Sequence, residues 1–319
     1  MKRLTAIALC LILTLSLAAC GASAPEPAPA PTAPTAADTP SPTEAPAPTA
    51  PADMTEAPTE DPAESYTLAD LALVSNEACS FTVTGTEFND HLGLQIHVLC
   101  ENKSDRTLTF TWNNTSVCGF MYEPYWSEEV AGGKKVNSTV GIDTYALEQM
   151  GIDSVDEVIF TLLVQDSEEF MNEPAVNESF VIYPTGKTAE TVKYPRYEPK
   201  EEDTVIVSND TLTFIIENAD DELADFYTLN CYMANHTDKN LMVSWDNVSV
   251  NGFMVDPYWS GILSAGKQAY TQVIFYRSDL EDQDIEVVQE VEFNLLVSDY
   301  DDWEADYLLD EVYTFNPAY

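Results

Sequence analysis

The sequence predicts an all-β protein with two tandem antiparallel β-sandwiches, each carrying one short helix, behind a disordered N-terminal stalk. A long segment occurs twice at a spacing of 245 − 112 = 133 residues, as WNNTSVCGFMYEPYWS at 112–127 and WDNVSVNGFMVDPYWS at 245–260. Within each copy, apolar and polar residues alternate over short stretches, which is typical of strands with one buried face. Before the first copy, residues 21–64 are nearly all Ala, Pro, Thr, Glu, Ser and Asp. Duplicated domains explain a period this long better than a solenoid of short repeats.

The first residues form a targeting segment. Lys2 and Arg3 precede an apolar run that is too short to span a bilayer. The run ends in Leu-Ala-Ala-Cys-Gly at 17–21, which resembles the lipobox of bacterial lipoproteins. The resemblance implies a signal peptide over 1–19 and a diacylglycerol anchor, with palmitate-type acyl chains, on Cys20. We therefore expect a chain anchored by lipid to the cell membrane at its extracytoplasmic face; a chance Cys after an ordinary signal peptide is the alternative.

The boundaries of the remaining segments follow from composition and from the repeat. Residues 20–65 contain no aromatic side chain, so they cannot bury enough apolar surface to fold, and their prolines favour an extended stalk. The first β-sandwich is expected over 66–186 and the second over 204–319. Between them, 187–203 form a linker whose Tyr-Pro-Arg-Tyr-Glu-Pro run makes a semi-rigid spacer.

A β-hairpin is expected near the start of each repeat. If Asn89 and Asp90 form a two-residue turn, the numbers of two opposing residues add up to 179. This register places Cys79 opposite Cys100 and joins apolar residues at every inward pair. Directly opposed cysteines outside the cytoplasm predict a Cys79–Cys100 disulfide, which we favour over a Cys100–Cys118 bridge. Two reduced, buried thiols remain the alternative, because a cross-strand bridge strains the S–S torsion.

The segment after this hairpin predicts a bulge, a tight turn and a helix. The alternation of apolar residues changes parity at Asn113-Asn114, and at the equivalent Asp246-Asn247, which indicates a β-bulge or a strand that crosses between sheets. Asn251-Gly252 favours a type I′ hairpin turn. Ser278 begins a capping box, and the first copy has a helix over 144–150 that ends at Gly151.

The final strands complete each predicted sandwich. Val291, Phe293, Leu295 and Val297 present one apolar face, and 180–183 and 312–315 read as the last strands. Six to eight short strands with turns and one helical turn favour an antiparallel β-sandwich.

The repeated motifs resemble a known kind of module. N-x-[ST]-D-x-x-L, W-x-N-x-S-V-x-G-F-M, P-Y-W-S and a later Gly-Lys occur in both copies, over 75–184 and 208–317. They are similar to the uncharacterised immunoglobulin-like modules of Firmicutes lipoproteins. The resemblance implies an immunoglobulin-like sandwich and implies no reaction, since no catalytic residues are assigned to such modules.

Charge excludes some partners. Removing the signal peptide leaves a formal charge of (13 − 2) − 55 = −44. A polyanion repels nucleic acids and anionic headgroups, so we expect no nucleic-acid partner. Cationic partners and multivalent cations remain candidates, beside a surface kept soluble by self-repulsion.

Several side chains are candidates for chemistry. The aromatic residues of the two Pro-Tyr-Trp segments are Tyr125, Trp126, Tyr258 and Trp259. They could stack on sugar rings or on a protein, although their position beside core strands favours a structural role. Acidic clusters at 299–306 and 220–225 could bind calcium but lack EF-hand order, so we predict no metal site and no cofactor. The three histidines have no partner at ligand or catalytic spacing and are expected at the surface. Cys118 is expected to be exposed in a turn, and Cys231 to be buried.

The expected function is therefore non-catalytic. The sequence favours a membrane-anchored lipoprotein that displays two β-sandwich modules for binding or scaffolding, with another surface protein or a cell-wall glycan as candidate partner. A carbohydrate-binding accessory protein with exposed aromatic side chains and a calcium-binding module are the alternatives. An enzyme would need titratable groups that converge in a pocket.

Overall fold

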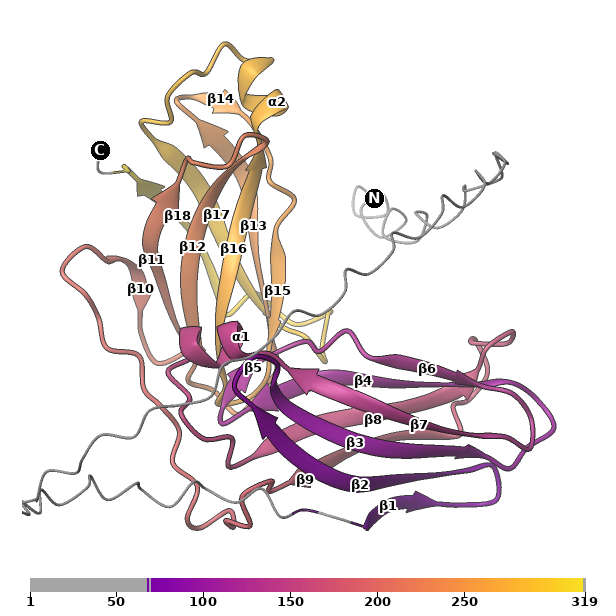
Figure 1. Ribbon diagram of the computed structural model, residues 1–319. Helices are drawn as coiled ribbons and strands as arrows, with labels where there is room; N and C mark the ends of the chain where they lie inside the picture. Colours follow the sequence, from indigo (N-terminus) through magenta and orange to yellow (C-terminus); the bar gives the residue numbers. More distant parts are fainter. Residues whose placement is uncertain (1–67, 69, 318–319) are drawn as a thin grey trace, which may run out of the picture. The chain divides into compact units, whose positions relative to one another are not determined.

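In the residues that the structure describes, the protein is all-β, with mainly antiparallel sheets and two short helices (Figure 1). The computed structural model describes Leu68 and residues 70–317. The predicted signal peptide, the lipid site at Cys20 and the stalk over 20–65 lie outside the described residues. The described residues belong to one compact unit. In this part of the chain, no helix has the length and apolar character needed to cross a membrane.

The elements of the first repeat lie between residues 71 and 182. They are β1 (Leu71–Ser75), β2 (Cys79–Asn89), β3 (Gly93–Asn102), β4 (Leu108–Val117), β5 (Phe120–Met121), β6 (Ser127–Val130), β7 (Lys135–Ile142), α1 (Thr144–Gln149), β8 (Val158–Asp166) and β9 (Val176–Ile182). The last strand therefore starts four residues earlier than the sequence predicted, at 176 in place of 180.

The second repeat has the same elements in the same order. They are β10 (Thr204–Ser208), β11 (Leu212–Asp220), β12 (Phe226–Asn235), β13 (Leu241–Val250), β14 (Phe253–Met254), β15 (Ser260–Leu263), β16 (Gln268–Tyr276), α2 (Arg277–Glu281), β17 (Val291–Asp299) and β18 (Leu309–Phe315). Each element begins 133 residues after its counterpart, from 71 + 133 = 204 to 176 + 133 = 309. The period seen in the sequence is thus the period of the structure.

Each repeat places two sheets around one core. In the first repeat, one sheet has the order β1-β2-β3-β7, and in the other β4 lies between β8 and the short strands β5 and β6, with β9 at the edge. Phe81 from the first sheet and Trp112 and Phe160 from the second are fully buried in a single cluster. Trp112 stacks on Phe160 with ring centroids 3.6 Å apart, and Trp245 stacks on Phe293 in the second repeat with the same separation.

The first hairpin is confirmed, but its predicted register is wrong. Cys79 pairs with Asn102 and Phe81 with Cys100, so opposing residues sum to 181 near the open end of the hairpin. A bulge between Val83 and Gly85 then moves the sum to 182. The reason is the turn: Asn89 pairs with Gly93, and the Asn89 side chain accepts hydrogen bonds within a longer loop. The predicted inward face survives because the register error near the cysteines is two residues, and side chains alternate with period two.

The predicted bulge and tight turn are both present. The pairing of β4 with β8 shifts between Asn113 and Ser116, and that of β13 with β17 shifts at the equivalent place. Asn114 and Asn247 have positive φ angles there, a backbone conformation in which Asn is enriched. Asn251 and Gly252 have φ of 52° and 83° between paired Val250 and Phe253, as a type I′ turn requires.

The two helices begin differently. Asp143 caps α1, and its carboxylate accepts a hydrogen bond from the Ala146 N–H at 2.8 Å. Gly151, with φ of 63°, follows the end of α1 as predicted. The predicted capping box at Ser278 is wrong: α2 starts at Arg277, and the capping residue Tyr276 makes no side-chain hydrogen bond to the helix. Tyrosine lacks the short side-chain oxygen with which Ser, Thr, Asp or Asn accepts a hydrogen bond from the first helical turn.

The N-x-[ST]-D-x-x-L motif builds a turn around a buried asparagine. Asn102 is 1% exposed, and its amide nitrogen donates to the carbonyl oxygens of Arg106 (2.6 Å) and Val130 (2.7 Å). Its side-chain oxygen accepts hydrogen bonds from the N–H and the hydroxyl of Ser104. Asn235 makes the equivalent bonds in the second repeat. One asparagine thus holds three backbone segments together in each repeat.

Candidate functional site: a methionine-lined cleft and the joint beside it

The two repeats are joined by the tip hairpin of the first repeat, residues 118–121. The Gln268 N–H, at the start of β16, donates to the Gly119 carbonyl at 3.0 Å, and β5 thereby pairs with β16 in parallel. Phe120 is 1% exposed and stacks on Tyr270, with ring centroids 5.5 Å apart and planes 4° from parallel. The strands of both repeats are therefore continuous through this contact in one sheet.

The segment predicted as a linker contributes to the same joint. The Tyr194 hydroxyl donates to a Glu157 carboxylate oxygen at 2.6 Å, and the Lys267 ammonium lies 5.2 Å from the Tyr194 ring centroid. Tyr197 stacks on Tyr232 at 4.1 Å. Residues of 187–203 therefore contact both repeats.

The repeat and alternation patterns of the sequence did not predict this joint. A signal was available in the differences between the copies: Tyr232 and Tyr270 replace Leu99 and Asn137, at 99 + 133 = 232 and 137 + 133 = 270. Leu99 and Asn137 do not face the first core, and an aromatic residue at such a position in only one copy indicates a partner surface.

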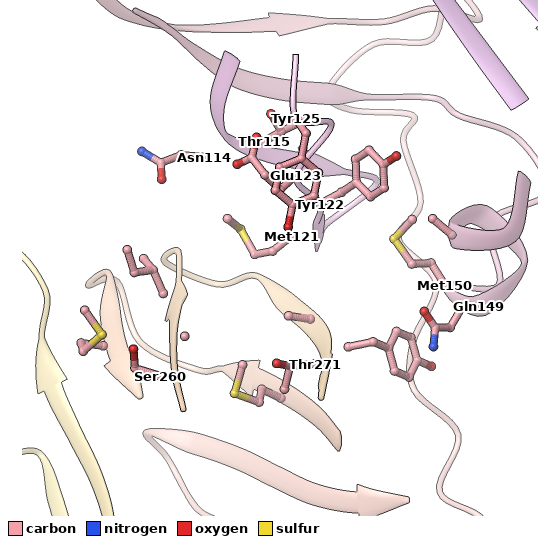
Figure 2. Close-up of a pocket in the computed structure, with 17 residues that line it drawn as sticks. Asn114, Thr115, Met121, Tyr122, Glu123, Tyr125, Gln149, Met150, Ser260 and Thr271 are labelled. Carbon is pink, nitrogen blue, oxygen red and sulfur yellow. The ribbon is translucent and has the colours of Figure 1, made fainter. Parts of the chain in front are cut away.

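A cleft of about 690 Å³ opens beside the joint (Figure 2). One wall comes from the first repeat, from residues around β5 and from α1, and the other from β12, β13, β15 and β16 of the second repeat. The lining residues are Asn114, Thr115, Met121, Tyr122, Glu123, Tyr125, Ala146, Gln149, Met150, Met233, Met242, Ser260, Gly261, Ile262, Ala269, Tyr270 and Thr271.

Methionine dominates the apolar part of this lining. Met121 and Met150 belong to the first repeat, and Met233 and Met242 to the second. Met150 and Met233 are buried, whereas Met121 and Met242 are half-buried. The methionine side chain is unbranched and polarizable, so a wall of methionines adapts to apolar partners of different shape. The cleft therefore suits an apolar ligand surface.

Few charged side chains line the cleft, and the hydroxyl of Tyr122 is already hydrogen-bonded to a residue outside the lining. Tyr122 donates its hydroxyl proton to Asp143 at 3.0 Å, which ties the tip hairpin to the cap of α1. Burial, and then this hydrogen bond, raise the pKa of Tyr122 to about 12, so the phenol is neutral at physiological pH. Of the residues that line the cleft, Glu123 is the sole acid, and none is Lys or Arg. The cleft is thus nearly uncharged in a chain with 55 acidic residues.

The four predicted stacking residues divide into two pairs. Trp126 is 8% exposed, packs on Phe81 and donates its indole N–H to Ser138. Trp259 is half-buried, packs on Phe214 and donates to Thr271 in the same way. Both tryptophans therefore pack against the cores of their repeats.

The tyrosines of the same segments point outward. Tyr125 is 92% exposed and Tyr258 is 89% exposed, with φ angles of 49° and 50°. A left-handed backbone at a bulky residue is costly. The Asp256 carboxylate holds this conformation by accepting the Tyr258 N–H at 2.7 Å. Tyr125 lies at the cleft, whereas Tyr258 is not among its lining residues.

The cysteines of the described part are all free and buried. The Cys79–Cys100 disulfide is absent, since the true register puts these residues two positions apart on their strands. Burial raises the pKa of Cys100 to about 12, so the thiol stays protonated. Cys118 is 1% exposed, which corrects the prediction of an exposed turn residue. Its sulfur accepts the Asp156 N–H at 3.3 Å beneath the linker segment. Cys231 is buried as predicted.

The other candidate groups serve the fold. Asp299 pairs with Lys239 at 2.7 Å, and Asp166 pairs with Arg106 at 2.7 Å. His91 and His236 are exposed, and His97 is half-buried beside Thr139. Within residues 70–317, no group of three or more His, Cys, Asp or Glu side chains could hold a metal ion.

Comparison with known proteins finds a weak likeness among solved structures. No protein-family model matches the chain, and no curated protein matches it. Among solved structures, it is similar to the exo-chitosanase CsxA of Amycolatopsis orientalis at 12% identity and a TM-score of 0.20, over 75% of this chain and 26% of that one. The chain thus spans about a quarter of that enzyme's length. A likeness at this TM-score carries no argument about fold or activity.

Proposed function

We propose that this protein is a lipid-anchored, extracytoplasmic binding protein with two immunoglobulin-like β-sandwich domains and no catalytic activity. The lipobox-like segment at 17–21 supports the anchor. The repeated pair of sheets around one core, each with a buried tryptophan on its central strand, supports the immunoglobulin-like assignment. The cell membrane is the partner of the acyl chains, and another surface protein is the partner of the domains.

The composition of the cleft is the observation that carries the binding function. Ligand sites are concave and mostly apolar, with a few polar groups that fix orientation. The cleft offers four methionines, the Tyr122 and Tyr270 rings and one rim carboxylate from Glu123. General acid–base or nucleophilic catalysis needs titratable groups that meet one another. In this cleft the Tyr122 hydroxyl is bonded to Asp143, and Glu123 is the sole acid among the lining residues. Binding of an apolar protein segment is the function that the lining supports best.

Carbohydrate binding is the second candidate. Tyr125 and Tyr258 are exposed rings held in costly backbone conformations in both repeats. They are the remaining support for stacking on sugars, since the tryptophans beside them are packed.

The anchor is tested by replacing the lipid site. Cys20→Ala should release the protein from membranes, whereas Cys10→Ala, inside the signal segment, should leave it anchored. Membrane sedimentation and mass spectrometry of the N-terminus provide the measurement. Protein with Cys20→Ala that still sediments with membranes contradicts the proposed anchor.

The cleft is tested through its methionines. The ε-methyl signals of the chain from residue 21 are recorded during titration with amphipathic peptides rich in Leu and Phe, and separately with chitin oligosaccharides. Peptide binding should shift the four cleft methionines and leave Met171, which is 86% exposed, unchanged. The variant Met242→Asp should weaken binding at least tenfold, against a matched Met171→Asp control. Sugar-induced shifts without peptide-induced shifts would favour the carbohydrate alternative.

A further inference from the structure

The tip hairpin that joins the repeats has a copy that is left uncovered. Phe120 and Met121 of the first tip lie against the second repeat, where Met121 packs on its core. The second tip, residues 251–254, has the same sequence Gly-Phe-Met after its first residue. Its φ angles of 52° and 83° match those of 45° and 88° in the first tip. The two hairpins therefore have the same backbone shape.

The difference between the tips is their exposure. Phe253 is 50% exposed and Met254 is 65% exposed, whereas Phe120 is 1% exposed. Val287, which is 48% exposed, extends the apolar surface, because its carbonyl accepts a hydrogen bond from Asn251. The second tip thus has the shape and apolar side chains of a docking element, and no described residue covers Phe253 and Met254 as β16 covers Phe120.

The surface that receives such a tip also has an uncovered copy. The first tip docks at Gln268, the first residue of β16, and beside Lys267, which precedes it. Their counterparts are Lys134 and Lys135, at 134 + 133 = 267 and 135 + 133 = 268, and both are exposed. Lys135 is the first residue of β7, as Gln268 is the first residue of β16. The strand β7 lies at the edge of its sheet.

Charge favours contact between these two uncovered surfaces. Glu157 and Lys267 both contact Tyr194 at the existing joint: the Tyr194 hydroxyl donates to Glu157 at 2.6 Å, and the Lys267 ammonium lies 5.2 Å from the Tyr194 ring centroid. The equivalent pair is Glu290, at 157 + 133 = 290, and Lys134. Glu290 lies at the second tip, since its N–H donates to the Asn251 side chain. Exposed acids surround it in that loop and α2, namely Glu281, Asp282, Asp284 and Glu286. Beside Lys134, Lys135 is paired with Glu101. Lys103 is exposed too, and its ammonium donates to Ser75 and to the Asn76 carbonyl.

We propose that the second tip docks on the start of β7 in a second copy of this chain, so that copies associate head to tail. Each contact would repeat the joint inside the chain, with the Lys135 N–H donating to the Gly252 carbonyl and Lys134 beside Glu290. A heterologous contact of this kind leaves a free tip and a free receiving strand, so it extends into chains unless it closes into a ring. Asn137 in place of Tyr270 removes the ring stack and makes this contact weaker than the internal joint. The inference does not rest on the lipid anchor or on the cleft.

Mixing two variants tests the direction of the contact. In the chain from residue 21, Phe253→Asp disables the tip and Lys134→Glu disables the receiving strand. Both positions are exposed, so folding is retained, and Val312→Asp on the exposed face of β18 is the matched control. Sedimentation velocity at 20 mM salt should show concentration-dependent association of the wild type and of the control. Each variant alone should stay monomeric, and an equimolar mixture should form dimers that grow no further. Salt at 500 mM should disperse the wild-type species, since it screens charge pairs.

Other outcomes overturn the proposal. A wild-type chain that stays monomeric at 20 mM salt up to its solubility limit excludes the contact. Self-association of the Lys134→Glu chain shows tip-to-tip packing, which is a different interface. Association that survives Phe253→Asp shows that the tip has no part in it.

Discussion

Removal of the buried Asn102 side chain should destabilise the first repeat strongly. In Asn102→Ala, four hydrogen bonds are lost: two donated to the carbonyls of Arg106 and Val130, and two accepted from Ser104. Each bond contributes about 1 kcal/mol net, and a buried group left without a partner costs about 1–3 kcal/mol. The expected loss in free energy of unfolding is therefore about 3–5 kcal/mol.

Urea denaturation followed by circular dichroism measures this loss. With a denaturant dependence of about 2 kcal/mol per molar urea, the midpoint of the affected repeat should fall by about 2 M. Asn235→Ala should produce the same loss in the second repeat, because its bonds are equivalent. Asn137→Ala is the matched control, since Asn137 is exposed on β7 and should change stability by less than about 0.5 kcal/mol. A loss below about 1 kcal/mol for Asn102→Ala would refute the reasoning, because it would mean that the released carbonyls find other partners without cost.

Three further predictions concern the joint, the thiols and the acid limit of stability. Tyr270→Asn installs the residue of the first copy and removes the stack on Phe120, so it should lower the free energy of unfolding by about 1–2 kcal/mol. Urea denaturation measures this loss, and an unchanged midpoint would contradict a stabilising joint. The chain from residue 21 has four thiols, and burial raises the pKa of each of them: Cys79, Cys100, Cys118 and Cys231. At pH 8 without reductant, a maleimide should label this chain slowly when it is native and at four sites when it is unfolded in urea; labelling at two sites in the unfolded chain would indicate a disulfide. The hydrogen bond from Lys239 holds the pKa of Asp299 below its usual value. The stabilisation by this pair is therefore present above about pH 4 and is lost as the pH falls further. Asp299→Asn should flatten that part of the stability–pH profile, and an unchanged profile would contradict the pairing.

The sequence determined those features that depend on side-chain alternation and on local turn chemistry. Phe81, Trp112 and Phe293 are buried as their period-two patterns predict, because alternate side chains of a strand point to opposite faces. Asn251-Gly252 forms its turn because these residues tolerate positive φ angles. The 133-residue period recurs in every element because the same local preferences are encoded twice.

Only the tertiary structure decided the register, the cysteine environments and the joint. The register of the first hairpin depends on how the Asn89 side chain closes its loop, and a slip of two residues leaves the same face inward, so burial patterns cannot detect it. Cys118 occupies a turn and was expected to be exposed, yet the linker segment covers it. The cleft and the covered Phe120 arise from contacts between residues about 150 positions apart, as at Phe120 and Tyr270. Such contacts depend on how two folded surfaces fit, and the alternation within either repeat carries no information about that fit.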